Sequence, residues 1–149
     1  MQFDSKGPAI RVKDISDFEA LVNVVLPDSY RSFLLTHNGG IPTPDIIDIP
    51  GLLSSPTDVQ VLFGIGRPVE SSNLAWNITL AEERCVGFRV LPFACDSGGN
   101  LFCFEIERGF ATKVIYLDFD TQEAASYTVA QSFQELIDRM RSMKSDPPS

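Results

Sequence analysis

The sequence is poor in the side chains that most often carry out metal and nucleophilic chemistry. Among its 149 residues, histidine occurs once, as His37, and the three cysteines, Cys85, Cys95 and Cys103, show no Cys-x-x-Cys spacing. An odd number of cysteines without that spacing argues against a disulfide framework and against a thiolate zinc site. We therefore expect three free thiols in a reducing cytoplasm, no metal site and no cofactor.

Long hydrophobic runs are also missing. No stretch approaches the roughly 18 apolar residues that a membrane span needs, and the first residues, MQFDSKGPAIRV, contain no apolar core of signal-peptide length. We expect no membrane association and a cytoplasmic location. The hydrophobic share of 44% and the charged share of 21% are those of one ordinary globular domain. We assign that domain to residues 8–143, with flexible termini at 1–7 and 144–149.

Positive charge is scarce. Lys and Arg number 12 against 20 Asp and Glu, so the net charge is −8. This field repels nucleic acid, which we therefore do not expect as a partner. No Lys or Arg lies between Arg31 and Arg67. The acidic balance serves solubility alone or presents an acidic face to a basic protein. For the second case the candidate contacts are Asp45, Asp48, Asp58, Asp118 and Asp120.

Apolar residues at helical spacing predict four helices. Ser16 with Glu19 three residues later matches a capping box and starts the first helix. Proline favours the start of the second helix, and Asn38-Gly39-Gly40 ends it. Thr128 with Gln131 is a second capping-box pattern, which starts the last helix. The predicted helices cover residues 16–25, 27–38, 71–83 and 128–140.

Runs of β-branched and aromatic residues between turn residues predict five strands, at Asp45–Ile49, Val59–Ile65, Phe88–Cys95, Leu101–Ile106 and Val114–Phe119. Short connections between the last three imply antiparallel neighbours, since a parallel crossover needs a dozen or more residues. The order is helices, strands, helix, strands, helix. It predicts an α+β domain whose antiparallel sheet presents one face to the helices.

The stretch Cys95–Asn100 reads CDSGGN and allows two interpretations. An Asp-Ser-Gly-Gly run surrounds the nucleophilic serine of trypsin-like proteases, and Ser97 would then need His37 as its base. The chain is too short for a two-barrel protease. We favour a hairpin turn between two apolar strands, with Gly98 and Gly99 at the central positions of a primed turn. A small serine hydrolase using Ser97 and His37 stays a remote alternative.

Three stretches together resemble one family. Leu26–Leu34, which reads LPDSYRSFL and is followed by Asn38-Gly39-Gly40, is similar to its first signature, and Leu91–Asn100 to its second. Val129–Met140 resembles its closing amphipathic helix. The family is the SUKH superfamily, which includes the fungal Smi/Knr cell-wall-assembly regulators and many bacterial proteins. The motif positions, which we interpret as framework, are Leu26, Pro27, Tyr30, Phe33, Asn38, Gly39, Gly40, Pro92, Asp96, Gly98 and Gly99.

The resemblance implies an α+β fold in which a twisted antiparallel sheet packs against helices. It also implies a binding role without shared catalytic residues. Many bacterial members resemble immunity proteins that neutralise toxin domains, often nucleases. Our first hypothesis is therefore a non-catalytic immunity protein whose protein partner is a basic toxin domain such as a nuclease. The alternative is a regulatory adaptor of the same fold without a toxin partner.

Overall fold

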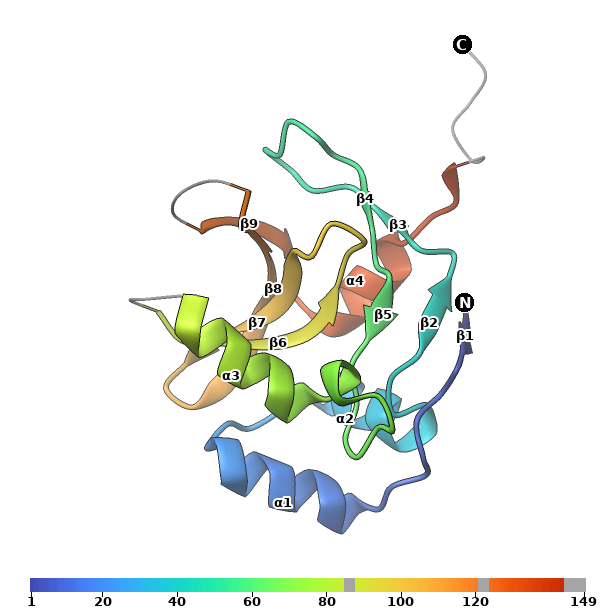
Figure 1. The fold of residues 1–149 in the computed structure, drawn as a ribbon, viewed down its shortest axis with the longest axis vertical. Helices are drawn as coiled ribbons and strands as arrows, with labels where there is room; N and C mark the ends of the chain where they lie inside the picture. The colour runs from blue at the N-terminus through green and yellow to red at the C-terminus, as the bar shows by residue number, and fades with distance from the viewer. Residues whose placement is uncertain (85–87, 121–123, 144–149) are drawn as a thin grey trace.

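The computed structural model describes residues 1–84, 88–120 and 124–143 (Figure 1). In these ranges the helices are α1 (Val12–Val22), α2 (Asp28–Thr36), the 3-10 turn η1 (Glu70–Ser72), α3 (Leu74–Arg84) and α4 (Phe133–Arg139). The strands are β1 (Gln2–Asp4), β2 (Ile41–Thr43), β3 (Ile46–Ile47), β4 (Thr57–Asp58), β5 (Val61–Leu62), β6 (Val90–Cys95), β7 (Leu101–Glu107), β8 (Phe110–Asp118) and β9 (Ala125–Ala130).

The main sheet has five antiparallel strands in the order β5-β6-β7-β8-β9. Two smaller pairs, β1–β2 and β3–β4, are also antiparallel. This confirms the predicted α+β fold with an antiparallel sheet packed against helices. The three predicted hairpin strands are β6, β7 and β8. The predicted strands at 45–49 and 59–65 are too long, because only the two-residue strands β3 and β5 form there.

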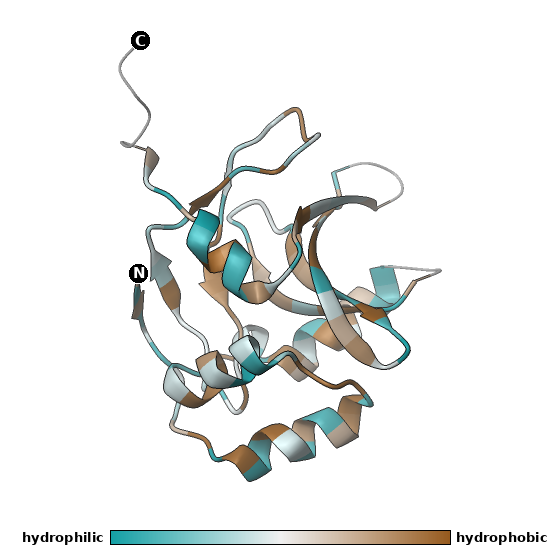
Figure 2. Cartoon of the chain, turned by 180° about the vertical axis from the view of Figure 1, so that it is seen from behind, coloured by the Kyte–Doolittle hydropathy of each residue, from teal (hydrophilic) through white to brown (hydrophobic). Residues whose placement is uncertain are grey.

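Helices cover both faces of this sheet, and the prediction of a single covered face is wrong. α3 lies over one face, against β6 (Figure 1). α4 lies over the other face, on the near side of the molecule in Figure 2, and α2 packs beside it, with the Tyr30 ring against Phe104 of β7. The sequence of β7 explains the difference. All four residues of Leu101–Phe104 are buried, and a strand that is buried on both sides shows a continuous apolar run in place of alternation.

An aromatic cluster fixes α2 and α4 against the sheet. The ring of Tyr30 on α2 lies 5.0 Å from that of Phe104 on β7 and 5.0 Å from that of Phe133 on α4. Phe93 on β6 stacks on Phe104 with their ring centroids 4.5 Å apart. Phe33 adds a contact to Phe133 at 5.3 Å. Edge-to-face and offset contacts of this kind stabilise a core beyond the area that they bury.

The first helix begins earlier than predicted. α1 starts at Val12, four residues before Ser16. Its capping box is formed by Arg11, whose backbone amide donates to the Asp14 carboxylate at 2.8 Å. The predicted cap at Ser16 is wrong because Ser16 lies inside α1, and the matching acid, Glu19, bonds residues outside this helix.

Glu19 links α1 to α2. Its carboxylate accepts hydrogen bonds from the backbone amide of Leu26 (2.7 Å) and from the Arg31 guanidinium (2.6 and 2.7 Å). The Glu19 side chain is only 11% exposed. A paired charge that is largely removed from water in this way costs more to break than a surface ion pair, because one partner is left buried and uncompensated.

A strand precedes the last helix where the sequence predicts helix. Ala125–Ala130 forms β9 and pairs with β8, so the predicted start at Thr128 is wrong. α4 begins after Ser132, whose hydroxyl accepts from the backbone amide of Glu135 at 3.1 Å. The same capping pattern therefore occurs one turn later than the one formed by Thr128 and Gln131.

The N-terminal segment takes part in the fold. β1 lies within the leader 1–7 that was predicted to be flexible, and it pairs with β2, Gln2 opposite Thr43. The tail 144–149 lies outside the described residues. The domain assignment to residues 8–143 stays a prediction. In the parts of the chain that the structure describes, no helix combines the length and apolar character needed to cross a membrane.

Candidate partner-binding surface

The structure separates the five predicted aspartates into three groups. Asp45 precedes β3 and Asp58 ends β4. The two lie close together, since the backbone amide of Val59 donates to the Asp45 carbonyl at 2.7 Å. Asp118 and Asp120 lie together at the end of β8, where the Asp120 amide donates to the Asp118 carboxylate at 2.9 Å. Asp48 stands apart from both groups.

The CDSGGN turn joins the first two groups. The backbone amide of Ser97 donates to the Asp58 carboxylate at 2.9 Å, and the Ser97 hydroxyl donates to the same carboxylate. On the other side, the Asn100 side-chain oxygen accepts from the backbone amide of Phe119 at 2.9 Å. The turn therefore lies between the two groups, at the upper side of Figure 1. We call this surface the acidic end and define it as Asp45, Asp58, Asp118, Asp120 and the turn 96–100.

Asp48 is already paired within the fold. Its carboxylate accepts from the Arg141 guanidinium at 2.9 and 3.0 Å. This hydrogen bond holds the pKa of Asp48 below its usual value. Because a neighbouring cation compensates its charge, Asp48 attracts a basic partner less than the other four aspartates do, and we leave it out of the candidate surface.

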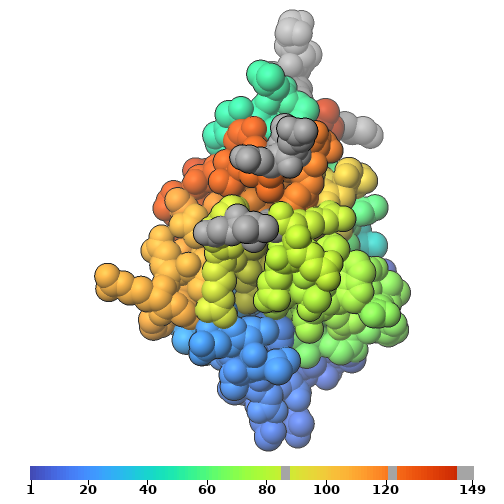
Figure 3. Space-filling view, turned by 60° about the vertical axis from the view of Figure 1, so that its left-hand side comes forward, coloured from blue at the N-terminus to red at the C-terminus, as the bar shows by residue number. Residues whose placement is uncertain are grey.

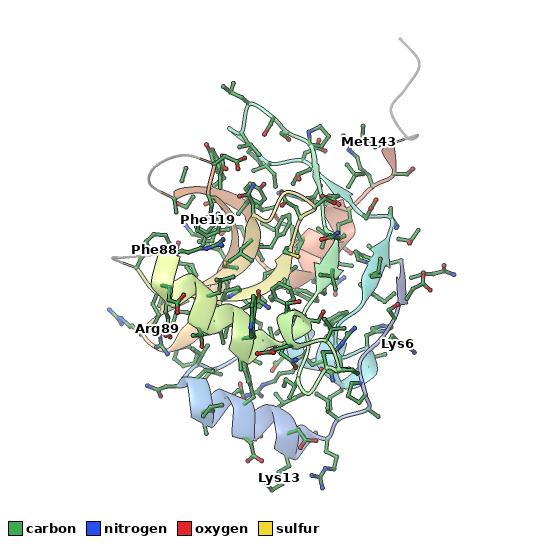
Figure 4. The ribbon with its side chains drawn as sticks, in the orientation of Figure 1. Lys6, Lys13, Phe88, Arg89, Phe119 and Met143 are labelled. Carbon is green, nitrogen blue, oxygen red and sulfur yellow. The ribbon has the colours of Figure 1, made fainter. Side chains whose placement is uncertain are left out.

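Positive charge lies mostly away from the acidic end. In Figure 4, Lys6, Lys13 and Arg89 lie in the lower half of the molecule, whereas Phe119, at the acidic end, lies in the upper half. Two described arginines approach the margin. The Arg84 guanidinium lies 5.2 Å from the Phe119 ring centroid, and Arg141, which bridges to Ile46 next to Asp45, is paired with Asp48. Two cations, one of them paired with Asp48, do not balance the four aspartates, so the local potential is negative.

A buried hydrogen-bond network supports the turn from below. The Asp96 carboxylate accepts from the Tyr116 hydroxyl at 2.5 Å and from the Thr57 hydroxyl at 2.9 Å. It also accepts from the backbone amides of Gly98 (3.0 Å) and Asn100 (2.9 Å). The Asn100 amide group in turn donates to the Tyr116 oxygen at 2.8 Å. Sequence reasoning assigned Asp96 to turn chemistry but missed Tyr116, which lies in another strand.

The turn itself differs from the predicted primed type. A primed turn needs positive φ at both central residues, but of the two glycines only Gly99 has a positive φ, at +87°. The amide of Gly99 donates to the Asp96 carbonyl at 3.2 Å, and the Asp96 amide donates to the Asn100 carbonyl at 3.0 Å. The connection is thus a longer loop organised by the Asp96 side chain, which is 3% exposed.

Asn38, from the first motif, is buried and fully hydrogen-bonded through its side chain. Asn38, which is 1% exposed, donates from its side chain to the carbonyls of Pro8 (2.9 Å) and Ile65 (2.8 Å). Its side-chain oxygen accepts from the Ile65 amide at 2.8 Å. The Arg67 guanidinium donates to the Asn38 carbonyl at 3.0 Å and to the Ser5 carbonyl at 2.7 Å. Asn38 therefore ties the N-terminal segment and the loop at 65–67 to the end of α2.

The two residues of the hydrolase alternative lie in different environments. The Ser97 hydroxyl bonds Asp58, whereas the His37 ring packs against Phe3 (4.6 Å) and Phe33 (5.5 Å). The Nδ1 atom of His37 is buried without a hydrogen-bond partner. Burial, followed by the nearby Lys6, lowers the pKa of His37. The geometry does not assemble the serine–histidine pair that this chemistry needs.

The cysteine beside the turn is a poor nucleophile. Burial, with the nearby Asp96 and Asp58, raises the pKa of Cys95 to about 11, so its thiol is protonated at neutral pH. Cys103 is buried in the core, and Cys85 lies outside the described residues. Within those residues, no group of three His, Cys, Asp or Glu side chains is placed to hold a metal ion.

An exposed leucine lies in the loop between β3 and β4. Leu53 is 104% exposed, although its loop is held by the Ser55 hydroxyl, which accepts from the Ile49 amide at 2.8 Å. Figure 2 shows the hydrophobic tip of this loop in brown. Sequence reasoning missed Leu53 because the proline-rich segment has no helical or strand periodicity. An ordered loop with an apolar tip is a suitable anchor for a protein partner.

Comparison with known proteins identifies one family. The model of the SMI1 / KNR4 family (SUKH-1) matches residues 9–139, from the start of the segment before α1 to the last residue of α4. No curated protein and no solved structure gives a significant match to the chain. The matched range contains both signatures noted in the sequence and all four aspartates of the acidic end.

Proposed function

The chain belongs to the SMI1 / KNR4 family (SUKH-1), and from this premise we propose that it is an immunity protein that binds and neutralises a basic toxin domain, such as a nuclease. The family suggests protein–protein interaction and is generally non-catalytic. The observation that carries the proposal is the acidic end, where four aspartates flank one turn. An acidic surface steers a basic partner into contact and raises the association rate.

The acidic end is held in place before any partner arrives. Asp58 is fixed by Ser97, and the turn that contains Ser97 is fixed by the buried carboxylate of Asp96. A surface that is ordered in advance loses less conformational entropy on binding. Leu53 adds an apolar contact beside the charges, because well-packed apolar anchors supply most of the affinity of a typical interface.

The site of action that we propose is the cytoplasm. Cys95 is a free thiol beside an exposed turn, and free thiols of this kind are typical of reducing compartments. A toxin nuclease delivered into a cell would meet its target there. Inhibition then requires the acidic end to cover the basic surface with which the toxin holds nucleic acid.

The test uses a toxin domain encoded beside this gene. We expect the chain to bind that domain and to inhibit its nuclease activity. Replacing Asp45, Asp118 and Asp120 by Asn should lower the association rate about tenfold at low salt, with the difference vanishing as salt screens the charges. The matched control replaces three exposed acids elsewhere by Asn: Asp4, Asp28 and Asp138.

The outcomes separate the two halves of the proposal. Inhibition with equal association rates for both triple variants would refute the acidic end as the contact. Binding of the toxin domain without any inhibition would favour the regulatory adaptor. Labelling of the chain by a fluorophosphonate probe, lost in Ser97→Ala, would support the hydrolase and overturn the binding role.

A further inference from the structure

The outer edge of β9 has no neighbouring strand among the residues that the structure describes. β9 is the last strand in the order of the main sheet. The opposite edge of the sheet is formed by β5, and the chain next to β2 covers it. Leu62 of β5 and Gly40, which precedes β2, exchange two backbone hydrogen bonds of 3.0 and 2.8 Å. The Arg139 guanidinium donates to the Val129 carbonyl at 2.8 Å, and the Tyr127 ring lies beside Gly51 in the loop between β3 and β4. Figure 3 shows β9 in orange, below the loop between β3 and β4.

Most of this edge lacks the devices that usually protect edge strands. Proteins block such edges with charged side chains, proline, bulges or very short strands. β9 has six residues, reads ASYTVA and contains neither a charge nor a proline. A register shift and the Arg139 contact disturb only the end near Val129. The stretch Ala125–Thr128 therefore keeps a regular, uncharged edge that can accept another strand.

We propose that β9 pairs antiparallel with β9 of a second copy of this chain, so that two sheets join across a two-fold axis. An axis at Tyr127 places Ser126 of one copy opposite Thr128 of the other. Both residues are exposed, and residues two apart share a face of a strand, so the pleats of the two strands match. A closed two-fold pair also leaves no further edge of the same kind, because both copies use it.

The charge distribution permits this pairing despite a net charge of −8 per chain. Asp118 lies opposite Ala125, at one end of β9, and Arg139 lies at the other. With the axis at Tyr127, the two copies of Asp118 are offset by about 13 Å along the strands and by about 14 Å across them, because β8, β9 and their two copies lie side by side; the separation is about 20 Å. This exceeds the Debye length of about 8 Å at physiological salt. The Ala125 end of each β9, next to Asp118, then lies beside the Val129 end of the partner copy's β9, where Arg139 is paired with Glu135 at 2.9 Å.

The pairing is measured as the mass of the purified chain by light scattering after size exclusion. We expect a mass that rises with concentration from 16.5 kDa towards twice that value. Replacing Ser126 and Thr128 by Lys sets like charges opposite each other across the axis and should weaken the dimer about tenfold. The control replaces the exposed residues Ser16 and Ala20 on α1 by Lys, which adds the same charge far from β9.

A mass of one chain at every concentration would overturn the proposal, as would a dimer that both Lys pairs weaken equally. If the double β9 variant fails to fold by circular dichroism, the single change Thr128→Lys decides. Hydrogen exchange gives a second readout, since amides of residues 125–128 should gain protection in concentrated samples and not in dilute ones. This inference is independent of the toxin, because it requires only the chain itself.

Discussion

Two tyrosines allow one chemical change to be tested in two environments. Tyr30 and Tyr116 are buried, with exposed fractions of 0% and 2%. The Tyr116 hydroxyl donates to Asp96 at 2.5 Å and accepts from Asn100 at 2.8 Å, whereas the Tyr30 hydroxyl has no hydrogen-bond partner. Replacement by Phe removes one oxygen in each case. We expect Tyr116→Phe to destabilise the protein and Tyr30→Phe to leave the stability unchanged or to raise it.

The magnitude follows from what each change leaves behind. Tyr116→Phe removes a hydrogen bond to a carboxylate, worth about 1.5–3 kcal/mol, and leaves the Asn100 side-chain amide unpaired in a buried site. Together these effects predict a loss of about 3 kcal/mol, or about 6–12 °C in Tm for a chain of this size. Tyr30→Phe removes an unsatisfied hydroxyl from an aromatic cluster, which relieves about 0–1 kcal/mol of desolvation.

Urea unfolding followed by fluorescence and circular dichroism gives both free energies by linear extrapolation. The slope with urea should be the same for both variants, because neither changes the surface that unfolding exposes. Equal destabilisation by the two changes would refute the reasoning. It would mean that removing the hydroxyl oxygen lowers stability by the same amount whether or not that oxygen has hydrogen-bond partners. A loss below about 0.5 kcal/mol for Tyr116→Phe would show that the Asp96 network adds little stability.

Two further predictions concern the first motif. Burial lowers the pKa of His37 in the folded protein, so the unfolded chain takes up a proton at a higher pH than the folded one, and the free energy of unfolding should fall as the pH drops below the ordinary pKa of about 6.5. In urea unfolding from pH 7.5 to 5.5, His37→Phe should flatten this decline. Parallel pH profiles of stability for the variant and the unchanged chain would contradict the assignment to His37. Gly39→Ala should lower the free energy of unfolding by at least about 2 kcal/mol more than Gly99→Ala does. Both glycines have positive φ, but a Cβ at Gly39 meets the Leu62 carbonyl oxygen at 2.8 Å, while one at Gly99 meets nothing within 4 Å. Equal losses of stability would mean that backbone strain alone sets the cost.

Elements with a strong local pattern could be predicted from the sequence. The second helix has a proline at its start and Asn-Gly-Gly after its end, and α2 occupies Asp28–Thr36 between them. The strands β6, β7 and β8 follow apolar runs separated by turn residues. In these cases backbone preference and burial favour the same structure, so the local signal is sufficient.

β9 was missed because a competing signal was given more weight. Two capping patterns occur four residues apart, at Thr128–Gln131 and Ser132–Glu135, and only the second caps a helix. The residues Ala125–Ala130 alternate between half-buried and exposed up to Thr128 and include Tyr, Thr and Val, which favour strands. The apolar stripe of Phe133, Leu136 and Ile137 follows both capping patterns and does not distinguish them, whereas the alternation of Ala125–Thr128 favours a strand before the second one.

The pairings at the candidate surface could not be read from the sequence. Asp48 and Arg141 are 93 positions apart, and Ser97 and Asp58 are 39 positions apart. Charge spacing identified the acidic residues, but only the folded chain shows which carboxylate is compensated. Local patterns carry no information on contacts of this range, because the tertiary fold brings the partners together.

The hydrogen bonds around Asn38 also bear on where this protein can be cut. The family model begins at residue 9 and ends at 139, yet Ser5, Gly7 and Pro8 each bond residues further along the chain. At the other end, the backbone of Arg141 exchanges two hydrogen bonds with β3. A chain trimmed to the matched range loses all of these contacts. The range that the family model matches is thus shorter than the segment of chain that these hydrogen bonds hold together.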